Sequence, residues 1–190
     1  ISGIENVVSG LANDTVTGDA GDNVLTDVGG TDIFDGGAGN DTYVFLPNWG
    51  IGDVVTGAGG MDWMDFSNIT SSLTIDLTST GISVGDGSNT VTSAGYIIEN
   101  IVGGSGADTF NITDAASVNL LGNSGNDVFN FTGSGSLIGN VDGGSGSNIL
   151  SYSDYDSSVV YNLETGSITG LTGTMSNIQT FIGSDYDDVL

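Results

Sequence analysis

Acidic side chains recur at nine-residue intervals near the start of the chain, in a pattern suited to holding a metal ion. Residues 9–44 divide into four nonapeptides: SGLANDTVT, GDAGDNVLT, DVGGTDIFD and GGAGNDTYV. The sixth position of each row holds an acid or its amide, namely Asp14, Asn23, Asp32 and Asp41. Carboxylate oxygens and the carbonyl oxygens of glycine turns are the ligands that Ca²⁺ prefers. These four residues are therefore candidate metal ligands.

Further rows follow the same pattern with insertions between them. They begin at Gly57, Gly103, Gly122 and Gly143, and an incomplete row, GSDYDDVL, begins at Gly183. They add four candidate ligands: Asp62, Asp108, Asp127 and Asp188. Asparagine at position 23, and at position 148 of the Gly143 row, removes charge and weakens or abolishes those half-sites. A second interpretation stays open for every row, because Asp also suits a glycine turn by bonding its own backbone.

The charge of the chain makes a bound cation the natural counterpart of these rows. The sequence has 24 acidic residues, no Lys, Arg or His, and a formal net charge of −24. Two carboxylates at the spacing of stacked strands repel by roughly 3 kcal/mol at an effective dielectric near 20. Burial of one apolar side chain per row returns only about 1.5–3 kcal/mol. We therefore expect Ca²⁺ between successive turns, and Mg²⁺ suits them less because it demands octahedral geometry and holds its waters.

The rows resemble the repeats-in-toxin (RTX) nonapeptide G-G-x-G-x-D-x-U-x. GGAGNDTYV and GGSGADTFN match it at every fixed position, GNSGNDVFN lacks one glycine, and the rows from Ser9, Gly18 and Asp27 are looser. The resemblance implies a protein exported by type I secretion that folds outside the cell when it meets calcium. The longer modules described below are most similar to tandem arrays in large bacterial surface adhesins.

The elements that carry these residues are predicted to be short strands between glycine turns. The eighth position of each row, which holds Val16, Leu25, Phe34 and Tyr43, should be core. We expect strands at 15–17, 24–26, 33–35 and 42–45, with longer ones near 73–77 and 158–163 that could leave the coil as hairpins. With two rows per coil, Asp14 should stack on Asp32 and Asn23 on Asp41. The predicted fold is all-β, a right-handed parallel β-solenoid of the β-roll or β-helix type.

A longer period overlies the rows. The stretch from Gly57 matches the stretch from Gly143 at an offset of 86 residues, and each copy ends in a phrase such as IENIV at Ile98 or IQTFI at Ile178. This predicts three parts: regular rows with a connector over 1–56, a solenoid module over 57–142, and a truncated second copy over 143–190. The chain therefore reads as a fragment of a longer array.

Composition excludes most other functions. Without His, Lys or Cys, the chain lacks a Ser-His-Asp triad, a Schiff-base lysine, a thiolate zinc site and disulfides. Its negative charge disfavours nucleic acid and anionic membrane surfaces, and no apolar run is long enough to span a bilayer. Trp49 and Trp63 could stack on sugars, but ordinary packing is the favoured interpretation. We predict a protein that is not an enzyme.

Three functional hypotheses remain. The first is a stalk or extender segment of a calcium-dependent adhesin at the bacterial cell surface. The second is a subunit of an S-layer or extracellular filament that assembles in calcium. The third is an RTX module of a larger secreted hydrolase or toxin. Beyond Ca²⁺, the partners expected are neighbouring copies of the chain or a surface or glycan target.

Overall fold

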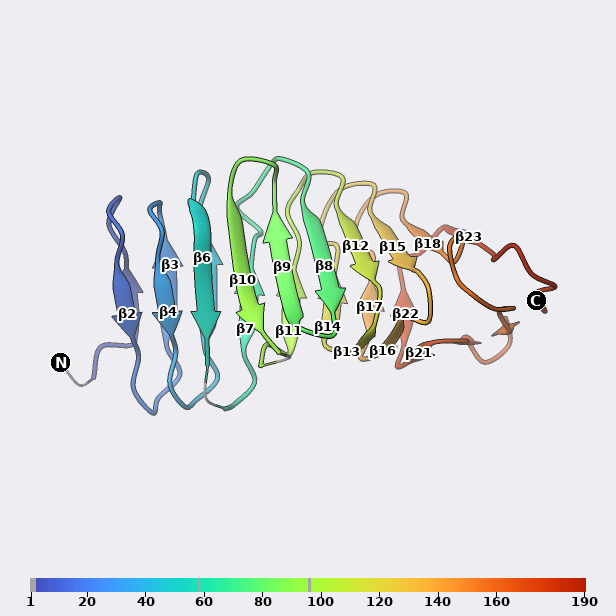
Figure 1. Cartoon of the computed structure of the whole chain (residues 1–190), viewed down its shortest axis with the longest axis horizontal. Helices are drawn as coiled ribbons and strands as arrows, with labels where there is room; N and C mark the ends of the chain where they lie inside the picture. Colours follow the sequence, from blue (N-terminus) through green and yellow to red (C-terminus); the bar gives the residue numbers. More distant parts are fainter. Residues whose placement is uncertain (1–2, 58, 96) are drawn as a thin grey trace.

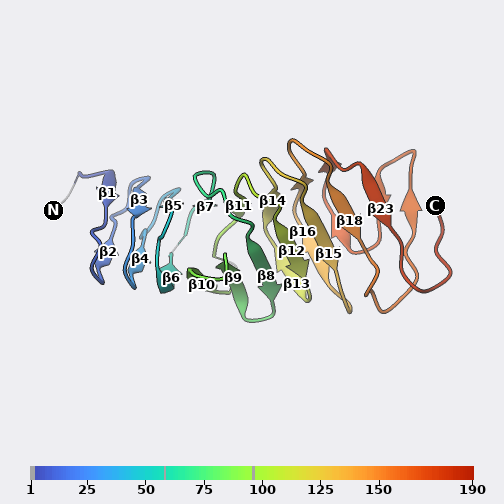
Figure 2. The ribbon, with the colours of Figure 1, turned by 90° about the horizontal axis from the view of Figure 1, so that it is seen from above.

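The chain folds as an elongated stack of short strands. The computed structural model describes residues 3–57, 59–95 and 97–190, and within them every regular element is a strand. Figure 1 shows the strands following one another along the long axis, with the two termini at opposite ends. Figure 2 shows the layered arrangement from above. No helix in the described parts of the chain is long and apolar enough to cross a membrane.

The described strands form three sheets. The first sheet holds eight strands in the spatial order β1 (Asn6–Val8), β3 (Val24–Asp27), β5 (Thr42–Phe45), β7 (Trp63–Asp65), β11 (Asn100–Val102), β14 (Asn119–Leu121), β17 (Val141–Asp142) and β22 (Met175–Ser176). The second holds ten: β2 (Thr15–Thr17), β4 (Ile33–Asp35), β6 (Ile51–Thr56), β10 (Thr90–Ala94), β9 (Gly81–Gly85), β8 (Thr74–Thr78), β12 (Thr109–Ile112), β15 (Val128–Phe131), β18 (Ile149–Ser151) and β23 (Thr180–Ile182). The third holds five: β13 (Ala115–Ser117), β16 (Ser136–Ile138), β21 (Leu171–Thr172), β20 (Ser167–Ile168) and β19 (Tyr161–Asn162).

Successive coils stack in parallel, with one strand in each of the first two sheets. Val16 lies opposite Phe34 in the β2–β4 pair, and Leu25 lies opposite Tyr43 in the β3–β5 pair. Each pair is 18 residues apart, which is the length of two nonapeptides. The all-β parallel solenoid predicted from the rows is confirmed.

The core lies between the sheets and is built from the predicted apolar column. Leu25, Phe34 and Tyr43 are each 1% exposed, whereas Val16 in the first coil is only partly buried. Aromatic rings at equivalent positions of successive coils stack directly on one another. Phe110 and Phe129 are 4.6 Å apart between ring centroids, as are Phe45 and Phe66. The repeat therefore places the inward side chains of equivalent strand positions on the same line through the molecule.

A three-stranded meander interrupts the regular coils. Strand β9 pairs antiparallel with β8 and with β10, while β10 pairs parallel with β6 and β8 parallel with β12. The hairpin expected near 73–77 therefore forms, but it stays inside the second sheet. The reason is its apolar face: Ile75, Leu77 and Val84 are 0% exposed and need the core that the sheet provides.

The second module repeats contacts of the first. The backbone N–H of Leu73 donates to Asp108 Oδ1 at 2.8 Å, and the N–H of Val159 donates to Asp188 Oδ1 at 2.7 Å. Strands β19 and β20 form the expected antiparallel hairpin around Gly166, although β19 is shorter than the predicted 158–163. This hairpin belongs to the third sheet, so the copy lies on a different side of the solenoid from the meander.

Candidate metal centre

Most candidate ligands occupy the residue just before a strand, at the corner where the chain enters a sheet, whereas Asp53 lies inside β6 and Asp188 precedes the isolated bridge residue Val189. Before the second sheet this column runs Asp14, Asp32, Asp53, Asp108, Asp127 and Asn148, and before the first sheet it runs Asn23, Asp41, Asp62 and Glu99. The glycine turn ends at this position and the strand begins, so each side chain points back into its own turn. Rows that follow one another at nine residues place their ligand at the two corners in turn.

From Asp32 and Asp41 onward, one oxygen of each side chain belongs to a hydrogen-bonded ladder along the solenoid. The backbone N–H of Asp14 donates to Asp32 Oδ1 at 2.9 Å, and the N–H of Asn23 donates to Asp41 Oδ1 at 2.8 Å. The same contact joins Asp41 to Asp62, Asp108 to Asp127 and Asp127 to Asn148, at 2.8–2.9 Å. The expected stacking is present, with a backbone amide between successive carboxylates. This amide tempers the repulsion that the sequence alone suggested.

Three ladder members are not predicted from the repeat pattern: Asp53, which accepts the N–H of Asp32, and two longer side chains in the IENIV and IQTFI phrases. The N–H of Asp62 donates to Glu99 Oε2 at 2.7 Å, and the N–H of Asn148 donates to Gln179 Oε1 at 2.6 Å. These residues lie in IENIV and IQTFI, where a longer side chain replaces Asp. A polar residue directly before a short strand was the available signal.

The other side-chain oxygen divides the candidates into two groups. In Asp14, Asp108 and Asp188, Oδ2 accepts the N–H of the residue four positions earlier, at 2.7–2.9 Å. In Asp32, Asp41, Asp62 and Asp127, Oδ2 is buried and has no hydrogen-bond partner, and these residues are at most 1% exposed. A buried carboxylate oxygen without a partner is costly. The second group therefore has oxygens free for a cation.

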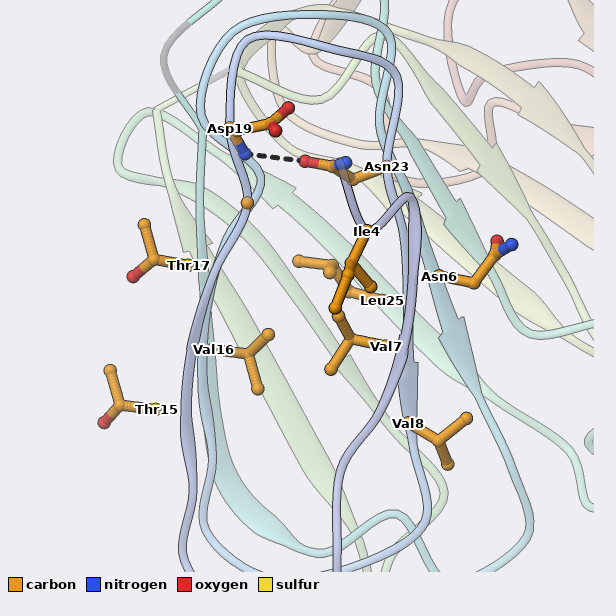
Figure 3. A pocket seen from close by; sticks show the side chains of 11 residues that line it. Ile4, Asn6, Val7, Val8, Thr15, Val16, Thr17, Asp19, Asn23 and Leu25 are labelled. Atoms are coloured by element: carbon orange, nitrogen blue, oxygen red, sulfur yellow. Dashed lines mark hydrogen bonds between the residues drawn. The ribbon is translucent and has the colours of Figure 1, made fainter. Parts of the chain in front are cut away.

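Asn23 closes its own turn instead of offering a free oxygen. Its Oδ1 accepts the N–H of Asp19 at 2.8 Å, as Figure 3 shows beside the inward-pointing Val7, Val16 and Leu25. Its Nδ2 is buried without a partner. An amide nitrogen is a donor and does not ligate a cation, so this side chain has only a shared oxygen to offer.

The glycine turns bring carbonyl oxygens to the same place as the carboxylates. A methyl group added to Gly103 would lie 2.6 Å from Asp108 Oδ2 and 3.0 Å from the carbonyl oxygen of Gly122 in the next coil. A methyl group on Gly122 would likewise meet Asp127 Oδ2, and would lie 2.7 Å from the Gly143 carbonyl oxygen. Glycine at the first repeat position therefore leaves room where oxygens from two coils converge. An all-oxygen set of this kind fits Ca²⁺.

No group of three or more acidic side chains is arranged for one ion in the part of the chain that the structure describes. A site in these turns would combine one or two carboxylates with backbone carbonyls and water. That composition is compatible with Ca²⁺, which takes six to eight oxygens in flexible geometry. Asp154 and Asp156 are exposed and belong to no such turn.

Burial makes the carboxylates hard to ionise in the absence of a cation. Desolvation raises the pKa of Asp108 and of Asp127 to about 6, against the lowering effect of the backbone N–H groups that they accept. Desolvation also raises the pKa values of Asp41 and Asp62. The pKa of Asp188, which is half-buried, is lowered, chiefly by the hydrogen bond from the Ser184 hydroxyl. A nearby cation would favour the charged form at each buried site.

Comparison with known proteins agrees with this geometry. The family model described as Peptidase M10 serralysin C terminal matches residues 53–159, which include Asp62, Asp108 and Asp127. Asp14, Asn23, Asp32, Asp41 and Asp188 lie outside the matched stretch. A search of curated proteins finds no significant match. Domains of the serralysin C-terminal family are calcium-binding RTX β-rolls that form the non-catalytic part of serralysin-type proteins. Because the matched stretch exceeds half of the chain, the protein belongs to this family.

Proposed function

We propose that this chain is a structural segment that folds and stiffens on binding extracellular Ca²⁺, as the stalk or extender of a secreted bacterial surface adhesin. The observation that carries the proposal is the set of buried, unpartnered Oδ2 atoms of Asp32, Asp41, Asp62 and Asp127. The chain has no cationic side chain that could neutralise them. Above the raised pKa values of Asp41, Asp62 and Asp127 a solvent cation is needed for this, and Ca²⁺ fits the oxygen set.

The shape supports a mechanical role. The termini lie at opposite ends of the stack, so the force along a tethered chain would run along the solenoid axis (Figure 1). Each coil contacts mainly its neighbours, so ions between coils stiffen the whole length. Further modules of the 57–142 and 143–190 type would lengthen the stalk without changing its construction. With no His, Lys or Cys, catalysis by this segment has little chemistry to draw on.

A second candidate function is favoured by the family match. The matched family is named for the C-terminal part of a peptidase, and its members belong to extracellular proteins exported by type I systems. The chain would then be the calcium module of a larger secreted hydrolase. A catalytic domain with His-based motifs in the same polypeptide would favour this function, and many further solenoid modules would favour the stalk.

A calcium titration followed by circular dichroism tests the proposal. We expect the β-sheet signal to grow with Ca²⁺ and to weaken on adding EGTA. Asp41→Ala should raise the calcium midpoint about tenfold, as expected for loss of a charged contact worth about 1.5 kcal/mol. Asp41→Asn keeps the acceptor for the Asn23 N–H and should also raise it.

Asp156→Ala is the matched control, because Asp156 is exposed and lies outside the repeat turns. Its calcium midpoint should equal that of the wild type. Equal effects of the Asp41 and Asp156 substitutions would contradict the ligand assignment. A wild-type chain as compact and heat-resistant in EGTA as in Ca²⁺ would contradict the proposed function itself.

A further inference from the structure

Asp27 occupies a core position of the solenoid, outside the acidic column of the repeats. Along β3 the burial alternates, so Asp27 points inward with Leu25. In the next coil the residue opposite Asp27 is Phe45, which stacks on Phe66 at 4.6 Å. Asp27 therefore places a carboxylate where the following coils have aromatic rings. Its place in the nonapeptide, the first, is held by glycine in the other rows apart from Ser9.

The Asp27 carboxylate is only half satisfied. The side chain is 1% exposed, and its Oδ1 accepts the N–H of Gly29 at 2.9 Å. Its Oδ2 is buried and has no hydrogen-bond partner. A carboxylate in a core position needs a compensating charge or proton, because its desolvation is otherwise prohibitive.

The neighbour across the core is a second buried carboxylate. Asp53 in β6 is 0% exposed, and its Oδ1 accepts the N–H of Asp32 at 2.6 Å. Its Oδ2 also has no partner, and the Asp27 and Asp53 side chains interact directly. The nonapeptide pattern hides Asp53, because the loop through Pro47 and Trp49 stretches the spacing from Asp32 to 21 residues. Two half-satisfied carboxylates thus face each other from opposite sheets.

A single shared proton does not neutralise the carboxylates of Asp27, Asp53 and the nearby Asp32. The negative charge of Asp32 acts on both Asp27 and Asp53, and its own Oδ2 is likewise buried and unpartnered. One proton among three buried carboxylates leaves two negative charges in the core, whereas one divalent cation leaves one. Burial and the repulsion from Asp53 raise the pKa of Asp27 to about 7, so a proton is also lost readily above neutral pH.

We infer that Asp27 and Asp53 bind one Ca²⁺ between β3 and β6, in a site where an aspartate stands at the first position of the turn, which the other rows apart from Ser9 fill with glycine. The two side chains supply the carboxylates, and turn carbonyls and water supply the remaining oxygens. Asp32 adds negative charge beside the site. The ion would tie the two sheets together beneath the loop that interrupts the 18-residue spacing. The inference deepens the proposed function and rests on it for the identity of the ion.

The test counts the calcium ions bound by the whole chain, by titration calorimetry at pH 7.5 and by native mass spectrometry. Asp27→Asn and Asp53→Asn keep the acceptors for the N–H groups of Gly29 and Asp32 and remove one charge each. Each variant should bind one Ca²⁺ fewer than the wild type. Asp27→Leu, which gives this coil an apolar residue as Phe45 does in the next, should show the same loss.

Asp65→Asn is the matched control. Asp65 also ends a strand of the first sheet and accepts the N–H two residues later, that of Ser67 at 2.8 Å, but it is half-buried. Its calcium count should equal that of the wild type. If all three site variants bound as many ions as the wild type with unchanged affinity, the pair would hold a proton only and the inference would be overturned. If the wild type bound no Ca²⁺, the proposed function would fail as well.

Discussion

Each ladder aspartate has two oxygens with different roles, and this explains where asparagine is tolerated. Oδ1 accepts a backbone N–H from the preceding coil, and an amide oxygen can do the same. Asn148 Oδ1 accepts the N–H of Asp127 at 2.9 Å, while its Nδ2 donates to the carbonyl oxygen of Asn177 at 2.9 Å. At Asp127, by contrast, Oδ2 and the Gly143 carbonyl oxygen converge beside Gly122 with no donor between them. The amide nitrogen of Asn148 therefore satisfies the carbonyl oxygen of the next coil by a hydrogen bond, where an aspartate would need a cation between the two oxygens.

Asp127→Asn should accordingly convert a calcium-dependent turn into a metal-independent one. The new Nδ2 would donate to the Gly143 carbonyl, and a desolvated charge would be removed. We expect the free energy of unfolding in EGTA to rise by about 1 kcal/mol, the net value of one hydrogen bond. The stabilisation gained on adding Ca²⁺ should shrink. Urea unfolding in EGTA and in CaCl₂ measures both quantities.

The exposed Asp154 provides the control, since Asp154→Asn removes the same charge outside the turns. It should leave the difference between the two unfolding curves unchanged. A loss of stability in EGTA for Asp127→Asn would count against the division of roles between the two oxygens.

At the scale of elements, the sequence predicts well those strands that keep the nine-residue spacing of the repeat. The rows from Ser9 to Val44 predict the bounds of β2, β4 and β5 to the residue. The reason is that the apolar residue at the eighth position of each row fixes which side chains of the strand point inward. Phase is lost where the chain inserts residues, and Asp53 is missed for that reason. Asp27 is missed because it stands at a glycine position, where no repeat rule assigns a ligand. The meander was read as a hairpin, since alternation alone does not say which neighbouring strands it joins.

The connection between β5 and β6 shows how an insertion can be packed. Trp49 lies in this loop and is 0% exposed, with its ring centroid 6.1 Å from that of Phe45 and 5.6 Å from that of Phe66. A buried indole has no free face for a sugar, so the packing interpretation holds for Trp49. The loop therefore adds a buried aromatic side chain to the core, at the coil that precedes the meander.

Trp49→Ala should destabilise the calcium-loaded protein by about 3–5 kcal/mol, because it removes a large side chain from a well-packed core. Guanidinium unfolding in excess CaCl₂ measures the loss. Trp63→Ala is the control, since Trp63 lies in β7 and is only half-buried. A loss for Trp49→Ala no greater than that for Trp63→Ala would mean that the loop does not contribute to the core.

At the scale of the whole molecule, the charge is unbalanced on the surface and in the interior alike. Asp27, Asp32, Asp41, Asp53, Asp62, Asp108 and Asp127 are buried in a chain with no positive side chain. Most proteins lose stability in acid because their ionised carboxylates are paired in the folded state. Here the metal-free folded state favours the protonated form, and net self-repulsion acts in the same direction. The sign of the pH dependence should therefore be reversed.

In EGTA, stability should be greatest near pH 4 and should fall as the pH rises to about 7. Burial raises the pKa values of Asp108 and Asp127 to about 6 and that of Asp27 to about 7, all from a usual value of 3.8. Over this window the folded state binds more protons than the unfolded state, so the free energy of unfolding decreases with pH. With saturating Ca²⁺ the ions replace these protons, and stability should instead rise across the same window. Thermal melts at pH 4, 5.5 and 7 in EGTA and in CaCl₂ give the two slopes. A metal-free chain that grew more stable from pH 4 to pH 7 would show that the buried carboxylates are stabilised by the protein alone, which would remove the physical basis for calcium-driven folding.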